Sequence, residues 1–176
     1  MYADALAYYD VNDNLKELAG ALARKARAGR ARILVGVDGS PASLGAVEHA
    51  RELLHGGAGD VRLANVQPAP AARDAREAGE RALLPAMALL DAAQVPYRAE
   101  VVFGEPAEAL LRHAVLTRST LIALGKSNRH AVLELLGGSM ARRVMARARL
   151  PVTLVERTLR ATTFPPRGAA GEARAA

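Results

Sequence analysis

The chain has 176 residues, which suffices for one domain with a substantial hydrophobic core. Hydrophobic residues make up 51% of the chain but aromatic residues only 3%, so the core must consist of small aliphatic side chains. The absence of cysteine excludes disulfides, thiolate metal sites and cysteine nucleophiles, and it fits a cytoplasmic protein.

The formal net charge of +6 raises the question of polyanionic partners. The positive charge is mostly Arg scattered among Ala, and it clusters only at 24–32 and 142–149. Neither cluster is interleaved with aromatic residues, as a stacking surface for single-stranded nucleic acid would be. No segment approaches the roughly 18 apolar residues of a membrane helix, and the N-terminus lacks the apolar core of a signal peptide. We therefore expect neither a nucleic-acid partner nor a membrane.

Residues 1–30 are predicted to form an N-terminal extension. Asn14 and Glu17 resemble a capping box, and apolar residues then recur at helical spacing, which predicts a short amphipathic helix. This helix is expected to dock on its own domain, with a dimer contact as the alternative. Residues 157–176 are rich in Ala, Arg, Gly and Pro, and this composition predicts a flexible tail.

Residues 31–156 alternate between buried strands and amphipathic helices. The strands are predicted at 32–37, 61–66, 97–103, 120–124 and 151–155, with four helices between them. Ser40 and Pro41 have the pattern of an N-cap and first helical residue, and Pro85 is expected to kink or split the helix at 74–94. This alternation predicts an α/β fold with a doubly wound, Rossmann-like, five-stranded parallel sheet of strand order 3-2-1-4-5.

In such a sheet, ligands bind at the carboxyl ends of the strands where the strand order reverses. Asp38 follows the first strand and Gly125 ends the fourth, so both face one crevice if these strands are neighbours. Asp38 could accept hydrogen bonds from ribose hydroxyls or hold a hydrated Mg²⁺, or it could simply cap the first helix. Gly138 and Ser139 lie where the next helix begins, where free N–H groups suit an anion, and ordinary N-capping is the alternative.

The sequence contains no P-loop, metal-ligand set or catalytic triad. The segment 125–127 (GKS) resembles the end of a P-loop, but the position that needs the first glycine is Thr120, inside a strand. The histidines on the predicted helices have no acidic or histidine partner at metal-ligand spacing, and no Ser, His and Asp set suits a catalytic triad. We therefore assign no catalytic and no metal-binding residues.

Several segments together resemble the universal stress protein family over residues 31–156. They are 33–40 (ILVGVDGS), 103–106 (FGEP), 125–128 (GKSN), 136–139 (LGGS) and 150–155 (LPVTLV). The nucleotide-binding branch of the family carries G-x-x-G, nine residues, then G-[S/T]. Here the second glycine of that pattern is replaced by Asn128. Asn tolerates left-handed backbone geometry, so the loop can keep its shape, but its side chain could either fill phosphate space or donate to a phosphate.

The resemblance implies a stress-response protein that binds ATP or a related adenine nucleotide, with Mg²⁺, as a regulatory ligand. It also implies a homodimer formed through the last strand. The implied adenosine contacts are Gly36, Val37, Asp38, Val66 (through its backbone) and Leu124, and the implied phosphate contacts are Gly125, Ser127, Asn128, Gly138, Ser139 and Met140.

Two alternatives remain open. In the first, Asn128 closes the pocket and the protein is a nucleotide-free dimeric protein-interaction module of the same fold. In the second, the protein is a weak nucleotide hydrolase. No positioned general base is recognisable, so catalysis would amount at most to slow ATP hydrolysis or autophosphorylation.

Overall fold

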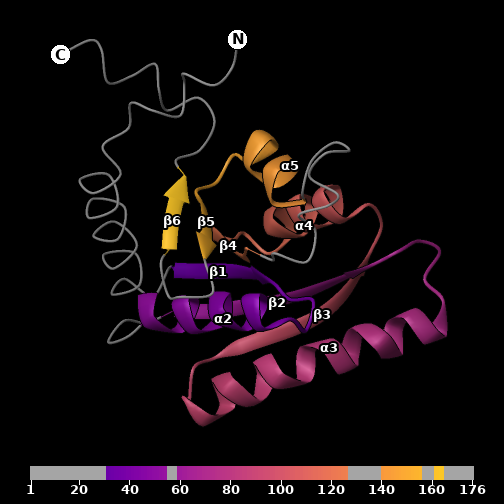
Figure 1. The fold of residues 1–176 in the computed structure, drawn as a ribbon, viewed down its shortest axis with the longest axis horizontal. Helices are drawn as coiled ribbons and strands as arrows, with labels where there is room; N and C mark the ends of the chain where they lie inside the picture. The colour runs from indigo at the N-terminus through magenta and orange to yellow at the C-terminus, as the bar shows by residue number, and fades with distance from the viewer. Residues whose placement is uncertain (1–30, 55–58, 127–139, 156–160, 165–176) are drawn as a thin grey trace.

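The computed structural model describes residues 31–54, 59–126, 140–155 and 161–164. In this part of the chain one sheet has the strand order β3-β2-β1-β4-β5-β6 (Figure 1). Its strands are β1 (Ala31–Gly36), β2 (Gly59–Gln67), β3 (Tyr97–Phe103), β4 (Leu121–Gly125), β5 (Val152–Val155) and β6 (Ala161–Phe164). β1 to β5 are parallel and stand in the expected order 3-2-1-4-5, so the predicted doubly wound fold is confirmed.

Helices cover both faces of the sheet (Figure 1). α2 (Pro41–Leu53) and α3 (Arg73–Ala92) lie on one face, and α4 (Pro106–Leu116) and α5 (Met140–Arg147) lie on the other. α2 begins as predicted, because the Ser40 hydroxyl accepts a hydrogen bond from the Ser43 N–H at 3.2 Å and Pro41 occupies the first turn.

α3 is one continuous helix with Pro85 inside it, so of the two expected effects, a kink or a split, the split does not occur. Pro85 lies on the exposed side, whereas the opposite side is buried on the sheet. The buried residues are Gly79, Leu83, Ala86 and Leu90, which lie both before and after the proline. Packing on both sides of a lost backbone hydrogen bond can hold a helix together where local propensity alone would end it.

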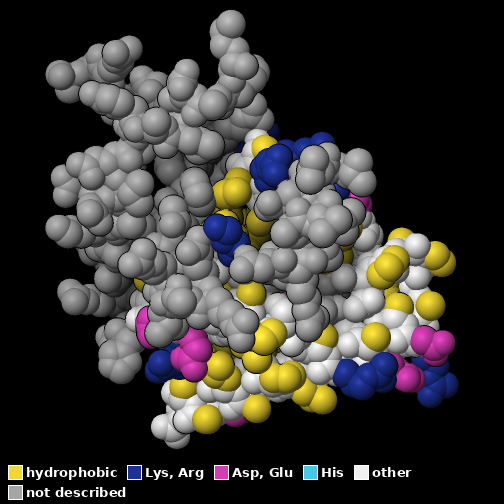
Figure 2. All heavy atoms as spheres, viewed as in Figure 1, with side chains coloured by type: hydrophobic (Ala, Val, Ile, Leu, Met, Phe, Trp, Pro, Cys, Tyr) yellow, Lys and Arg dark blue, Asp and Glu magenta, His cyan; other side chains and the backbone are white. Residues whose placement is uncertain are grey.

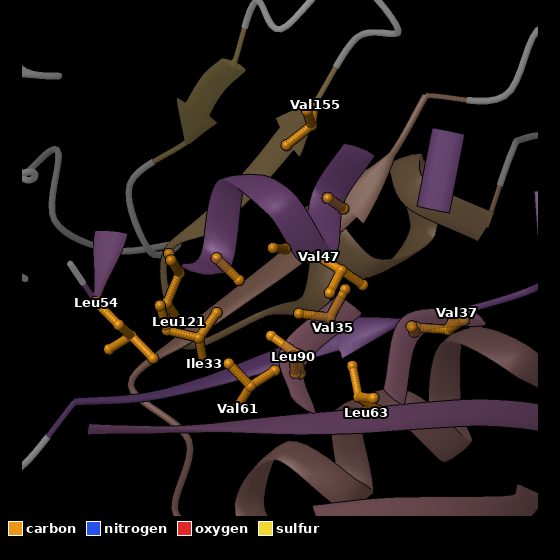
Figure 3. Close-up of a cluster of buried hydrophobic side chains, with 14 of the residues drawn as sticks. Ile33, Val35, Val37, Val47, Leu54, Val61, Leu63, Leu90, Leu121 and Val155 are labelled. Carbon is orange, nitrogen blue, oxygen red and sulfur yellow. The ribbon is translucent and has the colours of Figure 1, made fainter. Parts of the chain in front are cut away.

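The core consists of two apolar clusters, one on each face of the sheet. Ile33 and Val35 of β1 point toward Val47 of α2 and Leu90 of α3 (Figure 3), and each is at most 1% exposed. On the other face Leu34, Ile122, Leu110 and Val144 are fully buried between the sheet, α4 and α5. Burial of both faces explains why the central strands are nearly continuous apolar runs.

β6 is a strand that the sequence did not predict. It pairs antiparallel with β5, from Val152↔Phe164 to Val155↔Ala161. The prediction of a flexible tail is therefore wrong for these four residues, while the rest of 157–176, and 1–30 with its predicted helix, lie outside the described residues. An unpaired edge strand leaves its backbone groups without partners, and the Thr and Phe residues of 161–164 favour extended structure.

This strand bears on the predicted homodimer. β5 is hydrogen-bonded to β4 on one edge and to β6 on the other, so a dimer that pairs β5 with β5 would first have to displace β6. The homodimer itself stays a prediction. Within the described ranges, no helix has the length and apolar character needed to cross a membrane.

Candidate functional site at the switch point

β1 lies between β2 and β4, and this is where the strand order reverses. Gly36 at the end of β1 is in register with Leu124 of β4. The helices after these two strands, α2 and α5, pack on opposite faces of the sheet. The strand followed by Asp38 and the strand that ends at Gly125 are therefore neighbours, as the sequence analysis required for both residues to face one crevice. They meet at the switch point, where doubly wound proteins bind ligands.

Asp38 shapes the turn that leads into α2. Its Oδ1 accepts a hydrogen bond from the Ser40 N–H at 2.9 Å, and its own N–H donates to the Ser43 hydroxyl at 3.4 Å. Partial burial opposes ionisation of the carboxyl, but the hydrogen bonds from Ser40 and Ser43 outweigh it and lower the pKa of Asp38. The side chain is nevertheless exposed. Asp38 thus helps to cap α2 and still presents an ionised oxygen at the switch point.

Apolar side chains gather beside Gly36. A Cβ at this position would lie 2.8 Å from Leu124 Cδ2 and 3.8 Å from Met140 Cε, so a larger residue would require the Leu124 side chain to shift. Val66 packs in the same apolar cluster as Leu124 and Met140. The structure therefore brings four of the predicted adenosine and phosphate contacts together from β1, β2, β4 and α5.

Val37 lies on the other face, in the cluster beneath α2 and α3. Its N–H donates to the Ala64 carbonyl at 2.9 Å. Its carbonyl accepts a hydrogen bond from Asn65 Nδ2 at 2.7 Å, and Asn65 Oδ1 in turn accepts from Gln67 Nε2 at 2.7 Å. Asn65 is only 4% exposed, so β2 holds the end of β1 through a buried amide.

Asn65 was missed by the sequence reasoning. The available signal was a polar residue in alternation with the apolar Val61 and Leu63, on the inward-facing side of the strand. α3 packs tightly on the sheet at Gly79, where a Cβ would lie 2.8 Å from Asn65 Oδ1. Asn65, a residue outside the predicted site, thus bonds directly to Val37, and Gly79 leaves room for the Asn65 side chain.

Gly125 has a packing role that does not depend on any ligand. A Cβ at Gly125 would lie 2.2 Å from the carbonyl carbon and oxygen of Ala42 and 2.6 Å from the Ser43 nitrogen. The N-terminus of α2 therefore rests directly on the end of β4. The backbone continues toward Lys126, whose N–H donates to the Val155 carbonyl at 2.8 Å.

The predicted phosphate contacts Ser127, Asn128, Gly138 and Ser139 lie outside the described residues. Met140, the last of that set, is the first residue of α5. Of the six predicted phosphate contacts, the structure therefore describes only Gly125, before the segment 127–139, and Met140, directly after it.

α5 is tied to α4 by two ion pairs. Arg143 lies 2.8 Å from Glu105 Oε1, and Arg147 lies 3.0 Å from Glu108. Glu105 is also the N-cap of α4, where it accepts hydrogen bonds from the backbone N–H groups of Ala107 and Glu108. Desolvation opposes ionisation of Glu105, but these backbone donors and the two arginines together lower its pKa. α5 is thus linked along its length to the start of α4, which follows β3.

No cluster of three or more His, Cys, Asp or Glu side chains that could hold a metal ion occurs in the described ranges. A hollow of about 400 Å³ lies away from the switch point, between α3 and β3. At the switch point the described residues bring together one ionised carboxylate, Asp38, an apolar wall and Met140 at the start of α5.

Comparison with known proteins identifies the class. The model of the Universal stress protein family matches residues 29–156, which is most of the chain. The chain therefore belongs to the universal stress protein family. A search of curated proteins gave no match.

Solved structures of this family share the fold. A universal stress protein in complex with cAMP is 23% identical, with a TM-score of 0.59 over 71% of this chain and 96% of that chain. A member of the family from Burkholderia pseudomallei is 27% identical, with a TM-score of 0.55 over 73% of this chain and 97% of that one. A member from Arabidopsis thaliana with AMP bound is 16% identical, with a TM-score of 0.55 over 72% of this chain and 91% of that one.

Proposed function

We propose that this protein binds an adenine nucleotide at the switch point as a regulatory ligand in a cytoplasmic stress response. ATP with Mg²⁺ is the expected ligand. The observation that carries the proposal is the exposed, ionised Asp38 carboxylate, which follows β1 where that strand pairs with the end of β4. The relatives solved with cAMP and with AMP support the adenine nucleotide class.

Each part of the site has a role in this proposal. The exposed Asp38 carboxylate accepts hydrogen bonds from ribose hydroxyls or holds a hydrated Mg²⁺. The backbone of Val66 meets the adenine edge, and Leu124 packs against the base or ribose. Phosphates lie between the end of β4 and the start of α5, where backbone N–H groups and the helix dipole favour negative charge. The phosphate contacts are Gly125, Ser127, Asn128, Gly138, Ser139 and Met140.

Calorimetric titration with Mg-ATP, and in parallel with AMP, cAMP and GTP, tests the proposal. We expect saturable ATP binding that Asp38→Ala weakens by roughly tenfold to a hundredfold, as for other hydrogen bonds to charged groups. Glu52→Ala is the matched control, because it removes the same charge from an exposed position near the far end of α2. Equal loss of affinity in both variants would show a general charge effect rather than a contact by Asp38.

Asn128 discriminates the two binding alternatives. If its side chain obstructs the phosphates, Asn128→Gly will tighten ATP binding, and if it donates to a phosphate, the same change will weaken binding. Ser139→Ala is expected to weaken binding in either case. If titration with millimolar ATP gives no heat of binding, and ATP competes with none of the other nucleotides, the proposal is refuted and the nucleotide-free interaction module is favoured.

A hydrolase would behave differently from a sensor. It would release phosphate from ATP in a Mg²⁺-dependent reaction that Asp38→Ala abolishes, and a phosphate-release assay on the same samples measures this directly.

A further inference from the structure

β3 forms one edge of the sheet, and its outer side pairs with no other strand in the described ranges. The carbonyl of Pro96 and the N–H of Gly104 both bond to β2. In a parallel strand both backbone groups of a residue point to the same side, and successive residues alternate. The N–H and C=O groups of Tyr97, Ala99 and Val101 therefore point away from β2, toward the free edge.

The side chains along this edge alternate in character. Arg98 and Glu100 are exposed on one face, whereas Tyr97, Ala99 and Val101 are half-buried on the face that α3 covers. We infer that a second copy of this chain adds to this edge, with the two β3 strands antiparallel and related by a two-fold axis at Ala99. The result is one continuous sheet across two subunits.

The charge pattern selects this register. Outward-pointing residues must pair with one another, which allows two-fold axes at residue 98, 99 or 100 near the middle of the strand. An axis at Arg98 would place it opposite its own copy, and an axis at Glu100 would do the same for the glutamate. An axis at Ala99 places Arg98 opposite Glu100 of the second copy, and symmetry repeats the pair. Opposite charges directly across two strands stabilise the pairing, and like charges destabilise it.

The ladder geometry agrees with this register. Ala99 would exchange two backbone hydrogen bonds with its copy, and Tyr97 would do so with Val101 of the second copy. Arg98 and Glu100 then occupy the non-hydrogen-bonded positions, where cross-strand side chains are closest. The strand edge is therefore complementary to itself, and this favours a second copy over an unrelated peptide.

The hollow between α3 and β3 supplies apolar surface beside this edge. Its volume is about 400 Å³, and it is lined by Arg76, Glu80, Leu83, Leu84, Met87, Ala99, Glu100 and Val101. Leu84 is 58% exposed there. Figure 2 shows exposed hydrophobic side chains next to clusters of both charges along the side where α2 and α3 lie. The two-fold axis brings the second α3 to the same side of the sheet, where it can cover this surface.

Charge reversal tests the register. We expect sedimentation velocity over a wide concentration range to show a monomer–dimer equilibrium for the unchanged chain. Arg98→Glu and Glu100→Arg each create two like-charge pairs and should raise the dissociation constant by about tenfold or more. The double variant restores opposite charges with their positions exchanged and should return the dissociation constant close to its original value. A monomeric unchanged chain, a dimer insensitive to the single reversals, or a double variant without recovery would overturn the inference.

Two further variants test the backbone pairing and the location. Ala99→Pro removes an N–H that points outward and leaves the bonds to β2 in place, so it should weaken the dimer while circular dichroism stays unchanged. Because the chain lacks cysteine, Ala99→Cys should give a covalent dimer with a short bis-maleimide. Val115→Cys, on a side chain that is 73% exposed at the end of α4, should not. Crosslinking of the Val115 variant alone would overturn the inference.

Discussion

Replacing Gly125 by Ala tests how closely α2 approaches the end of β4. The added Cβ would lie 2.2 Å from the carbonyl carbon and oxygen of Ala42 and 2.6 Å from the Ser43 nitrogen. These neighbours are backbone atoms, so no side-chain rotation can relieve the overlap. Either the N-terminus of α2 or the end of β4 must move, and the turn that carries Asp38 moves with α2.

The expected cost follows from the kind of contact. Overpacking a well-packed site costs typically 1–3 kcal/mol, and a clash with backbone belongs at the upper end of that range, at about 2–3 kcal/mol. For a chain of this length each kcal/mol lowers the melting temperature by roughly 2–4 °C, so Gly125→Ala should lower it by about 5–10 °C. Urea denaturation measures the free energy of unfolding of both proteins directly.

Gly45→Ala is the matched control. Gly45 lies in the interior of α2, and its added Cβ would have Val155 Cγ1 at 4.0 Å as its nearest neighbour. Because Ala is a better helix former than Gly, this variant should gain up to about 1 kcal/mol. A Gly125→Ala protein as stable as the unchanged chain would refute the close approach of α2 to β4.

Two further predictions concern buried polar groups. Asn65→Ala should lower the free energy of unfolding by about 1–3 kcal/mol, because it removes the donor to the Val37 carbonyl from a buried position, whereas Gln67→Ala, at a half-buried position, should cost less. Equal costs in chemical denaturation would contradict the central role of Asn65. Burial lowers the pKa of His113, Glu100 partly opposes this shift and Arg62 adds to it, so the folded protein favours the neutral ring. As the pH falls below about 6.5, His113 binds a proton in the unfolded chain before it does so in the folded protein, so the free energy of unfolding decreases until the pH reaches the folded pKa of His113. His113→Gln should remove this part of the decrease. Parallel stability profiles from pH 7.5 to 5 for the two proteins would contradict this reasoning.

The sequence predictions were accurate where a few neighbouring residues determine the structure, and less so where contacts between distant segments determine it. The strand ending at Gly36 and the helix beginning at Pro41 were predicted to within one residue, because an apolar run followed by Ser-Pro is a local pattern. The sequence left a split at Pro85 open, because the packing that keeps α3 continuous is made with the sheet. On α4 the apolar Val115 is 73% exposed whereas the polar His113 is buried, which residue type alone does not indicate.

The candidate site divides in the same way. Asp38 and Gly125 could be proposed from the sequence because strand ends at a switch point are the expected place for a ligand. The packing role of Gly125 against Ala42 could not, since it depends on how closely a helix some eighty residues earlier approaches the strand. The hydrogen bond from Asn65 to Val37 likewise joins two strands whose distance in space the sequence does not state.

By itself, the sequence determined the class of fold, the order of its elements, the family resemblance and the positions of the strand ends. These follow from periodicity, capping and turn residues, which act over a few neighbouring positions. The tertiary structure decided that β6 covers β5, that Asn65 holds the end of β1, and which backbone groups of β3 point outward. Each of these depends on contacts between distant segments, because the free energy of such a contact is set by which surfaces meet and not by the residues adjacent in the chain.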